Sequence, residues 1–342
     1  MDGTHCIGKR AAAILLGFFA VAALMLPSAQ AAERTVSELI PVGQVIGVKL
    51  FSDGVLVVGL SDGESPAKAC GLKEGDVITA VGGQELDTIE EFRQLLAENG
   101  ADAAALTVKR GSRTLELRAA PEKDESGDYR LGAWVRDSMA GIGTMTFYDP
   151  ESGIFGALGH GVTDADTGKL LPLDHGSIMD ASVKAVKRGE RAVPGELKGD
   201  FDLTRDSGTL FANTESGIFG KLSVEDAEKL RTQALPIAGK SELKTGKAQI
   251  LATVEGKETR AYDIEIEKIY SSSGSTRNFL LHVTDEALLA QTGGIVPGMS
   301  GSVVLKDGKI VGAVTHVLLD DPTRGYGIFI ENMLAAAGLQ TA

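Results

Sequence analysis

The sequence predicts a mainly β protein in which two globular units follow an N-terminal export segment. Three observations carry this prediction: 43 glycines among 342 residues, many short apolar runs separated by Gly, Asp and Asn, and little helical periodicity. Glycine at this frequency suits tight turns between short strands. The chain is also long enough for two domains, each with its own core.

The first 32 residues have the order of a targeting segment. Lys9 and Arg10 precede an apolar run over residues 11–26, and small residues follow through Ala31. This order indicates a signal peptide or a retained membrane anchor over residues 1–32. The apolar run is short for a spanning helix, although a tilted anchor remains open. We therefore expect the rest of the chain to be exported, either secreted or membrane-tethered.

The composition excludes several kinds of partner. A net charge of −13 argues against binding to nucleic acid, which needs a basic face for the phosphates. The two cysteines, Cys6 and Cys70, cannot form a disulfide framework, and no His or Cys pair has the spacing of a metal site. We expect no cofactor, no metal and no nucleic acid.

Residues 35–118 are predicted to form the first unit. Apolar strands precede the stretch Cys70–Ile78, which reads CGLKEGDVI, and a helix begins after the capping box of Thr88 and Glu91. This order resembles a PDZ domain, with Cys70–Ile78 as its most specific part.

The resemblance implies a peptide or C-terminal ligand, because PDZ domains take up a peptide as an added strand between a sheet edge and a helix. Ile46, Gly47 and Val48 would then supply backbone N–H groups to the terminal carboxylate. The alternative is a PDZ fold whose groove only packs against the neighbouring part of the chain.

Residues 119–130 are polar and predict a linker. Beyond it, residues 131–342 predict a β-barrel or sandwich. The candidate strands cover residues 131–135, 143–148, 154–158, 209–211, 249–254, 262–269 and 279–283. The sequence ESGIFG occurs twice, at 151–156 and 215–220, which we interpret as two turns of similar chemistry.

A candidate nucleophile lies near the C-terminus. Ser300 stands in the sequence GMSGS at 298–302, ahead of two apolar strands joined by an Asp307-Gly308 turn. A serine in a glycine-rich bend before a hairpin is how chymotrypsin-like barrels present their nucleophile. The N–H groups of Gly298 and Ser300 would form the oxyanion hole.

A serine nucleophile needs a base and a group that orients the base. His160 is the leading candidate for the base, because glycines flank it and an apolar run precedes it. The alternatives are His175, His282 and His316. For the orienting acid, spacing does not choose among Asp285, Asp164, Asp166 and Asp174.

The chain resembles SpoIVB-type serine peptidases of spore-forming bacteria in four stretches and in the order of export segment, PDZ domain and C-terminal peptidase. The four stretches are residues 155–160, 283–285, 294–302 and 312–327. The resemblance implies His160 as base, Ser300 as nucleophile and Asp285 as the third member of the triad. One departure is Val303, which stands where the family usually has proline.

The resemblance also implies a function. Such a protease would act in the space between the forespore and mother-cell membranes, guided by its PDZ domain. It would cleave itself and a membrane-bound regulator of an intramembrane protease, leading to activation of a late sigma factor.

The sequence also allows two other interpretations. One is an inactive PDZ scaffold, which the intact Ser300 and His160 count against. The other is an HtrA-type envelope protease, in which the protease precedes the PDZ domain, the reverse of the order here.

Overall fold

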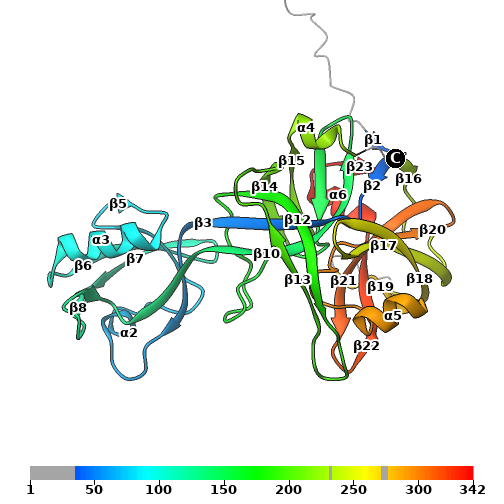
Figure 1. Cartoon of the computed structure of the whole chain (residues 1–342). Coiled ribbons are helices and arrows are strands. Elements are labelled where there is room, and N and C mark those ends of the chain that lie inside the picture. Colours follow the sequence, from blue (N-terminus) through cyan, green and yellow to red (C-terminus); the bar gives the residue numbers. More distant parts are fainter. Residues whose placement is uncertain (1–34, 231–232, 271–275, 342) are drawn as a thin grey trace, which may run out of the picture. The chain divides into compact units, whose positions relative to one another are not determined.

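The computed structural model describes residues 35–230, 233–270 and 276–341 (Figure 1). The predicted signal peptide or anchor over residues 1–32 lies outside the described residues. Within the described ranges, no helix is long and apolar enough to cross a membrane.

The peptidase part contains two rings of strands, which confirms the mainly β prediction. In the first ring, the pairing of β10 with β3 closes a row of six strands. In order around the ring these are β3 (Val45–Leu60), β10 (Ala133–Asp149), β11 (Ile154–Ala157), β15 (Gly217–Leu222), β14 (Gly208–Thr214) and β12 (His175–Lys187). Strand β13 (Glu196–Phe201) pairs with β12, and β2 (Glu38–Pro41) joins β10 to β16 (Leu235–Pro236).

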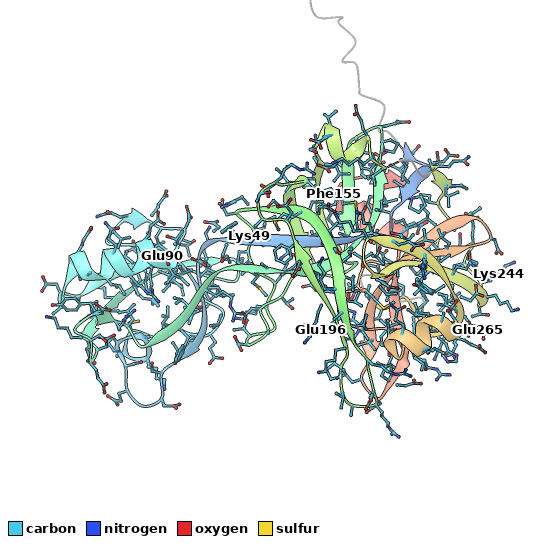
Figure 2. All side chains as sticks on the ribbon, viewed as in Figure 1. Lys49, Glu90, Phe155, Glu196, Lys244 and Glu265 are labelled. Atoms are coloured by element: carbon cyan, nitrogen blue, oxygen red, sulfur yellow. The ribbon has the colours of Figure 1, made fainter. Side chains whose placement is uncertain are left out.

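The second ring is a closed six-stranded barrel. Its strands in ring order are β17 (Gly246–Glu255), β18 (Glu258–Ile269), β19 (Phe279–Val283), β22 (Asp321–Phe329), β21 (Lys309–Leu318) and β20 (Val303–Lys306). Strand β18 shows why the sequence forms a barrel: Ile264 and Ile266 are buried, whereas Glu265 between them is exposed (Figure 2). The helices of the peptidase part are short: α4 (Val224–Ala227), α5 (Glu286–Thr292) and α6 (Ile330–Ala336). The two-residue strands β1 (Thr35–Val36) and β23 (Gln340–Thr341) lie near the ends of the described chain.

The repeated ESGIFG segments pair with each other. Each begins in a turn, as predicted, and its apolar half forms β11 or β15, with Phe155 opposite Gly220 and Gly156 opposite Phe219. A Cβ atom on Gly220 would lie 2.7 Å from the ring of the fully buried Phe155 (Figure 2). The glycines of the repeat therefore make room for aromatic rings inside the first ring of strands.

The PDZ unit is an insertion between β3 and β10. It contains α2 (Pro66–Ala69), β4 (Val77–Val81), β5 (Gln84–Glu85), α3 (Ile89–Asn99), β6 (Ala104–Arg110) and β7 (Arg113–Ala119), followed by the small hairpin of β8 (Glu122–Lys123) and β9 (Tyr129–Arg130). The capping box predicted at Thr88 and Glu91 is present at the start of α3. The predicted linker thus contains two short paired strands.

The structure corrects the prediction that Ile46, Gly47 and Val48 receive a peptide carboxylate. They lie inside β3, where Gly47 pairs with Ile142 of β10 on one side and with Met179 of β12 on the other. Because both edges of the strand are paired, its N–H groups are not offered to a ligand. The reason is that β3 is one continuous strand of 16 residues whose first half belongs to the peptidase ring.

In the PDZ unit, the edge of β3 that does not pair with β4 pairs with β10. Ala133 of β10 pairs with Leu60, and Trp134 pairs with Gly59. The preceding Leu131 is 2% exposed and belongs to the PDZ core. Among the described strands, residues 133–136 of β10 pair only with β3, so their second edge stays unpaired. A hollow of about 560 Å³ remains between α3 and residues 129–135.

The stretch Cys70–Ile78 contains a buried carboxylate. Asp76 is 1% exposed, and Arg110 of β6 contacts both of its oxygens at 2.7 Å. The N–H of Lys73 donates to the same carboxylate at 2.8 Å. The charge of the buried Asp76 carboxylate is therefore balanced by the guanidinium of Arg110, which lies on β6.

We expect Arg110→Met to lower the free energy of unfolding by about 3 kcal/mol, because it leaves the buried Asp76 charge without its cation. Urea unfolding followed by circular dichroism measures this. Arg113→Met is the matched control, since Arg113 is exposed and stands opposite Arg110 in the same hairpin. Equal stability of the two variants would contradict the interpretation.

Candidate active site

Ser300 lies in a turn that only glycine permits at two positions. Gly298 has φ +102° and Gly301 has φ +98°, both in the region that favours glycine. A Cβ on Gly301 would lie 2.0 Å from the Thr144 carbonyl oxygen, and one on Gly298 would lie 2.9 Å from Leu197 Cβ. The GMSGS sequence is thus required by backbone conformation and by close approach to the first ring.

Thr144 of β10 holds the Ser300 turn with its backbone and its side chain. Its N–H donates to the Ser300 carbonyl at 3.0 Å, and its hydroxyl donates to the Gly298 carbonyl at 2.9 Å. The Thr144 carbonyl accepts from Leu158 N–H at 3.1 Å. Two residues further on, the Thr146 hydroxyl donates to the Gly301 carbonyl at 2.8 Å. Strand β10 therefore links the serine turn of the second barrel to the segment that carries His160.

His160 follows a sharp bend after β11. Leu158 has φ +68° and Gly159 has φ +69°, so two successive residues adopt the left-handed conformation. A Cβ on Gly159 would lie 3.0 Å from Thr315 Cγ2, and one on Gly161 would lie 2.6 Å from the Thr214 carbonyl oxygen. The glycines on either side of His160 therefore allow the bend, as the sequence predicted. They also allow the backbone at residues 159–161 to approach both rings of strands closely.

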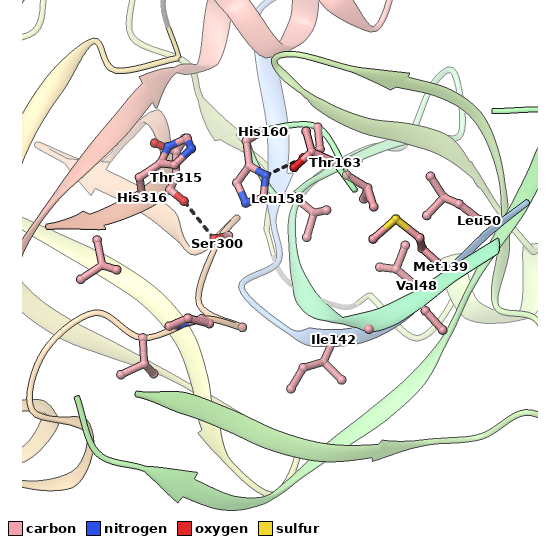
Figure 3. A pocket seen from close by; sticks show the side chains of 18 of the residues that line it. Val48, Leu50, Met139, Ile142, Leu158, His160, Thr163, Ser300, Thr315 and His316 are labelled. Carbon is pink, nitrogen blue, oxygen red and sulfur yellow. Dashed lines mark hydrogen bonds between the residues drawn. The ribbon is translucent and has the colours of Figure 1, made fainter. Parts of the chain in front are cut away.

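His160 and Ser300 line one cavity of about 450 Å³ (Figure 3). The Ser300 hydroxyl donates to the Thr315 carbonyl at 2.9 Å, and His160 Nδ1 lies 2.8 Å from the Gly161 carbonyl oxygen. Among the hydrogen bonds of the described residues, none joins Ser300 to His160. Catalytic hydrogen bonds are often long or poorly aligned before substrate binds and tighten in the substrate complex.

The backbone at Ser300 is suited to an oxyanion. In the described part of the chain, neither the N–H of Gly298 nor that of Ser300 has a hydrogen-bond acceptor, whereas Met299, Gly301 and Ser302 all donate to carbonyls. The structure thus leaves unpaired the two N–H groups that the sequence assigned to an oxyanion hole.

The two histidines of the cavity are held neutral. Burial lowers the pKa of His160 below its ordinary value, and the hydrogen bond to Gly161 opposes this only in part. Burial also lowers the pKa of His316 to about 4, with repulsion from His160 adding to the effect. The two rings are 5.2 Å apart between centroids. A neutral imidazole is the form that can accept a proton.

The structure does not bring Asp285 to this cavity. Asp285 caps α5, where its carboxylate accepts the N–H of Leu288 at 3.0 Å and that of Asp263 at 3.3 Å. The aspartate before a short helix is used locally, as capping residues commonly are.

The rival residues also have other partners. Asp164 and Asp166 pair with Arg136, and Asp174 pairs with His175. His282 lies 3.5 Å from Glu267. Of the predicted bases, only His160 and His316 line the cavity. No cluster of His, Cys, Asp or Glu among the described residues is arranged to hold a metal ion.

The sequence analysis did not identify Thr144, which holds the Ser300 turn, or Thr315, whose carbonyl accepts from the Ser300 hydroxyl. Thr144 and Thr146 alternate with Met145 and Phe147 in an apolar strand, and all four are buried. Two buried threonines on one face of a strand require hydrogen-bond partners, and this pattern could have marked them as structurally important. The sequence did not indicate which groups they bind, because these groups lie 154 and 155 residues away.

Comparison with known proteins identifies the family. The sequence model described as SpoIVB peptidase S55 matches residues 127–334. The chain belongs to the SpoIVB peptidase S55 family. It has the PDZ domain expected beside the peptidase, since a PDZ model matches residues 57–110. As a member of this family the chain is a serine endopeptidase with a PDZ domain.

Individual relatives are more distant. A curated Clostridium perfringens (strain 13 / Type A) protein whose name describes a zinc metalloprotease is 34% identical over 68 residues, 20% of each chain. The S55 chain therefore spans about a fifth of the length of this curated relative.

Among solved structures, the Rv3671c protease of M. tuberculosis in its active form is 16% identical, covering 60% of this chain and 77% of its own with a TM-score of 0.33. The HtrA-type protease AlgW with a decapeptide is 12% identical, covering 71% and 65%, with a TM-score of 0.33. The PDZ domain of an SdrC-like protein from Listeria monocytogenes is 24% identical, covering 24% and 87%, with a TM-score of 0.23.

We expect Gly301→Ala to destabilise the protein by about 3 kcal/mol or more, because it combines a left-handed backbone with a Cβ in contact with the Thr144 carbonyl. Gly308→Ala is the matched control: its φ is +75°, but nothing lies within 4 Å of the added Cβ. That variant should lose only about 1 kcal/mol. Denaturant unfolding of both variants separates close contact from backbone strain, and equal losses would contradict the tight packing of the Ser300 turn.

Proposed function

We propose that Ser300 is the nucleophile and His160 the general base of this S55 serine endopeptidase. The observation that carries the proposal is their convergence. Ser300 comes from the second barrel and His160 from the first ring, they are 140 positions apart in the sequence, and they line the same cavity. The unpaired N–H groups of Gly298 and Ser300 complete the parts that acyl transfer needs.

In the proposed mechanism, Ser300 leaves the Thr315 carbonyl and turns toward His160. The Gly161 carbonyl accepts the Nδ1–H of His160, which leaves Nε2 as the ring's proton acceptor. Ser300 Oγ attacks the peptide carbonyl while Nε2 takes its proton, and the N–H groups of Gly298 and Ser300 stabilise the oxyanion.

His160 then gives the proton to the leaving amine. In the second half of the reaction His160 takes a proton from water as the water oxygen attacks the acyl carbonyl, and it returns this proton to Ser300 Oγ when the acyl-enzyme bond breaks. In this assignment a backbone carbonyl, that of Gly161, orients the base, and Asp285 serves as the cap of α5.

We further propose that the substrate is a membrane-bound regulator of an intramembrane protease, and that its cleavage leads to activation of a late sigma factor. Two observations support this proposal. The chain belongs to the SpoIVB peptidase S55 family, and the sequence of residues 1–32 indicates export. The site of action would be the space between the forespore and mother-cell membranes, and the chain would also cleave itself. A peptide ligand of the PDZ unit would lie in the hollow between α3 and residues 129–135, added as a strand to the unpaired edge of residues 133–136.

The test of the nucleophile and base is labelling of the full-length chain with a fluorophosphonate probe. Wild type should be labelled, Ser300→Ala should not be, and His160→Ala should be labelled at least about 1,000-fold more slowly. His175→Ala is the control, because His175 is exposed and lies outside the cavity. Labelling of Ser300→Ala, or no labelling of folded wild type, would overturn the assignment.

Asp285→Asn belongs in the same labelling series, because asparagine also caps helices well. We expect it to be labelled within about twofold of the wild-type rate. A loss of about 10⁴ would instead show that the Asp285 carboxylate orients His160 during catalysis.

The lowered pKa of His160 predicts the acid limb of the pH profile. Only neutral His160 accepts the proton, so kcat/KM should rise with pH and reach its plateau with a midpoint below the ordinary histidine value of 6.5. Hydrolysis of unfolded casein between pH 4 and pH 9 measures this. A midpoint at or above 6.5 would contradict a buried neutral base.

A further inference from the structure

We infer that this peptidase selects an apolar substrate side chain next to the scissile bond, and that Met139 and Gly141 of β10 determine the selection. The inference rests on the proposed function of Ser300 and His160 and adds the class of substrate. It comes from the side chains that share the cavity with these two residues.

The wall of the cavity beside Ser300 is apolar. Figure 3 shows the side chains of Val48, Leu50 and Met139 close together on one side of Ser300 and His160. Val48 and Leu50 belong to β3, Met139 belongs to β10, and Leu158, which follows β11, packs in the same apolar cluster. Ile142 also lines the cavity, from the opposite face of β10. Within the described ranges, the residues that line the cavity include no Asp, Glu, Lys or Arg. A charged substrate side chain placed here would lose its hydration without gaining a partner, whereas an apolar one gains by leaving water.

The strand register explains why a hollow exists at this place. Met139 pairs with Leu50, and Gly141 pairs with Val48, so these four positions share one face of the β3–β10 pair. Gly141 contributes no side chain opposite Val48, and a Cβ added to it would meet nothing within 4 Å. The missing side chain leaves room that a substrate side chain can fill.

The position of the hollow ties it to catalysis. Leu158 lies two residues before His160, and its N–H is held by Thr144, which also holds the Ser300 turn. The apolar wall and the reacting groups are thus fixed to one strand, β10. At about 450 Å³, the cavity has the size of pockets that enclose a small ligand, enough for a side chain together with the peptide bond being cut.

Two substitutions should change the selection in different ways. Gly141→Leu fills the hollow without backbone strain, because φ at Gly141 is not in the left-handed region. It should lower kcat/KM for large apolar residues by about tenfold or more and favour Ala or Gly. Met139→Lys places a cation in the wall and should raise the share of Asp and Glu at that position by about tenfold.

The experiment uses the full-length chain and a proteome-derived peptide library, with cleavage sites identified by mass spectrometry. Ser300→Ala defines the background, and Leu203→Lys is the matched control for an added lysine, since Leu203 is 70% exposed and lies outside the cavity. The inference is supported if wild type and Leu203→Lys both show apolar residues enriched at one position flanking the cut. In addition, Gly141→Leu should favour Ala or Gly at that position, and Met139→Lys should favour Asp and Glu.

Ser300-dependent cleavage that shows no apolar enrichment, or a profile that neither Met139→Lys nor Gly141→Leu alters, would overturn the inference and leave the proposed function standing. Absence of both Ser300-dependent cleavage and fluorophosphonate labelling in folded wild type would instead overturn the proposed function, and this inference with it.

Discussion

The hydrogen bonds of Thr144 are the interaction on which the site depends. One buried residue donates to the Ser300 and Gly298 carbonyls and accepts from Leu158, so a single strand fixes both the serine turn and the histidine segment. Thr144 is 1% exposed, and at a buried residue an unmade hydrogen bond is costly. Neither ring of strands contains a complete site by itself, and the geometry of the pair follows from how closely β10 approaches the turn.

That close approach in turn requires glycine at the points of contact. At Gly301 and Gly159, added side-chain atoms would meet the opposite part of the structure, and both residues also have positive φ. Backbone freedom and small size are needed at the same positions. The high glycine content therefore serves the packing of the two rings as well as the turns between short strands.

The strands β3 and β10 also connect the two functions of the chain. The second half of β3 and the first half of β10 form part of the PDZ unit. The first half of β3 and the second half of β10, which contains Thr144, form part of the peptidase ring. Covering the β3 edge with residues 133–136 satisfies an otherwise open strand edge. The PDZ unit is thus joined to the peptidase ring by two continuous paired strands, and one of them, β10, is hydrogen-bonded to the Ser300 turn through Thr144.

The sequence by itself determined the elements whose causes are local. Alternation along β18, the capping box at Thr88, and the glycine-framed Ser300 and His160 are all set by neighbours within a few residues. Tertiary structure decided what depends on pairing partners far apart in the chain. Residues 46–48 have the pattern of a strand, but only the pairing with β10 and β12 showed that both of its edges are used. The partners of Asp285 and Thr144 were likewise fixed by packing, because a carboxylate or hydroxyl carries no mark in the sequence of the group that it will meet.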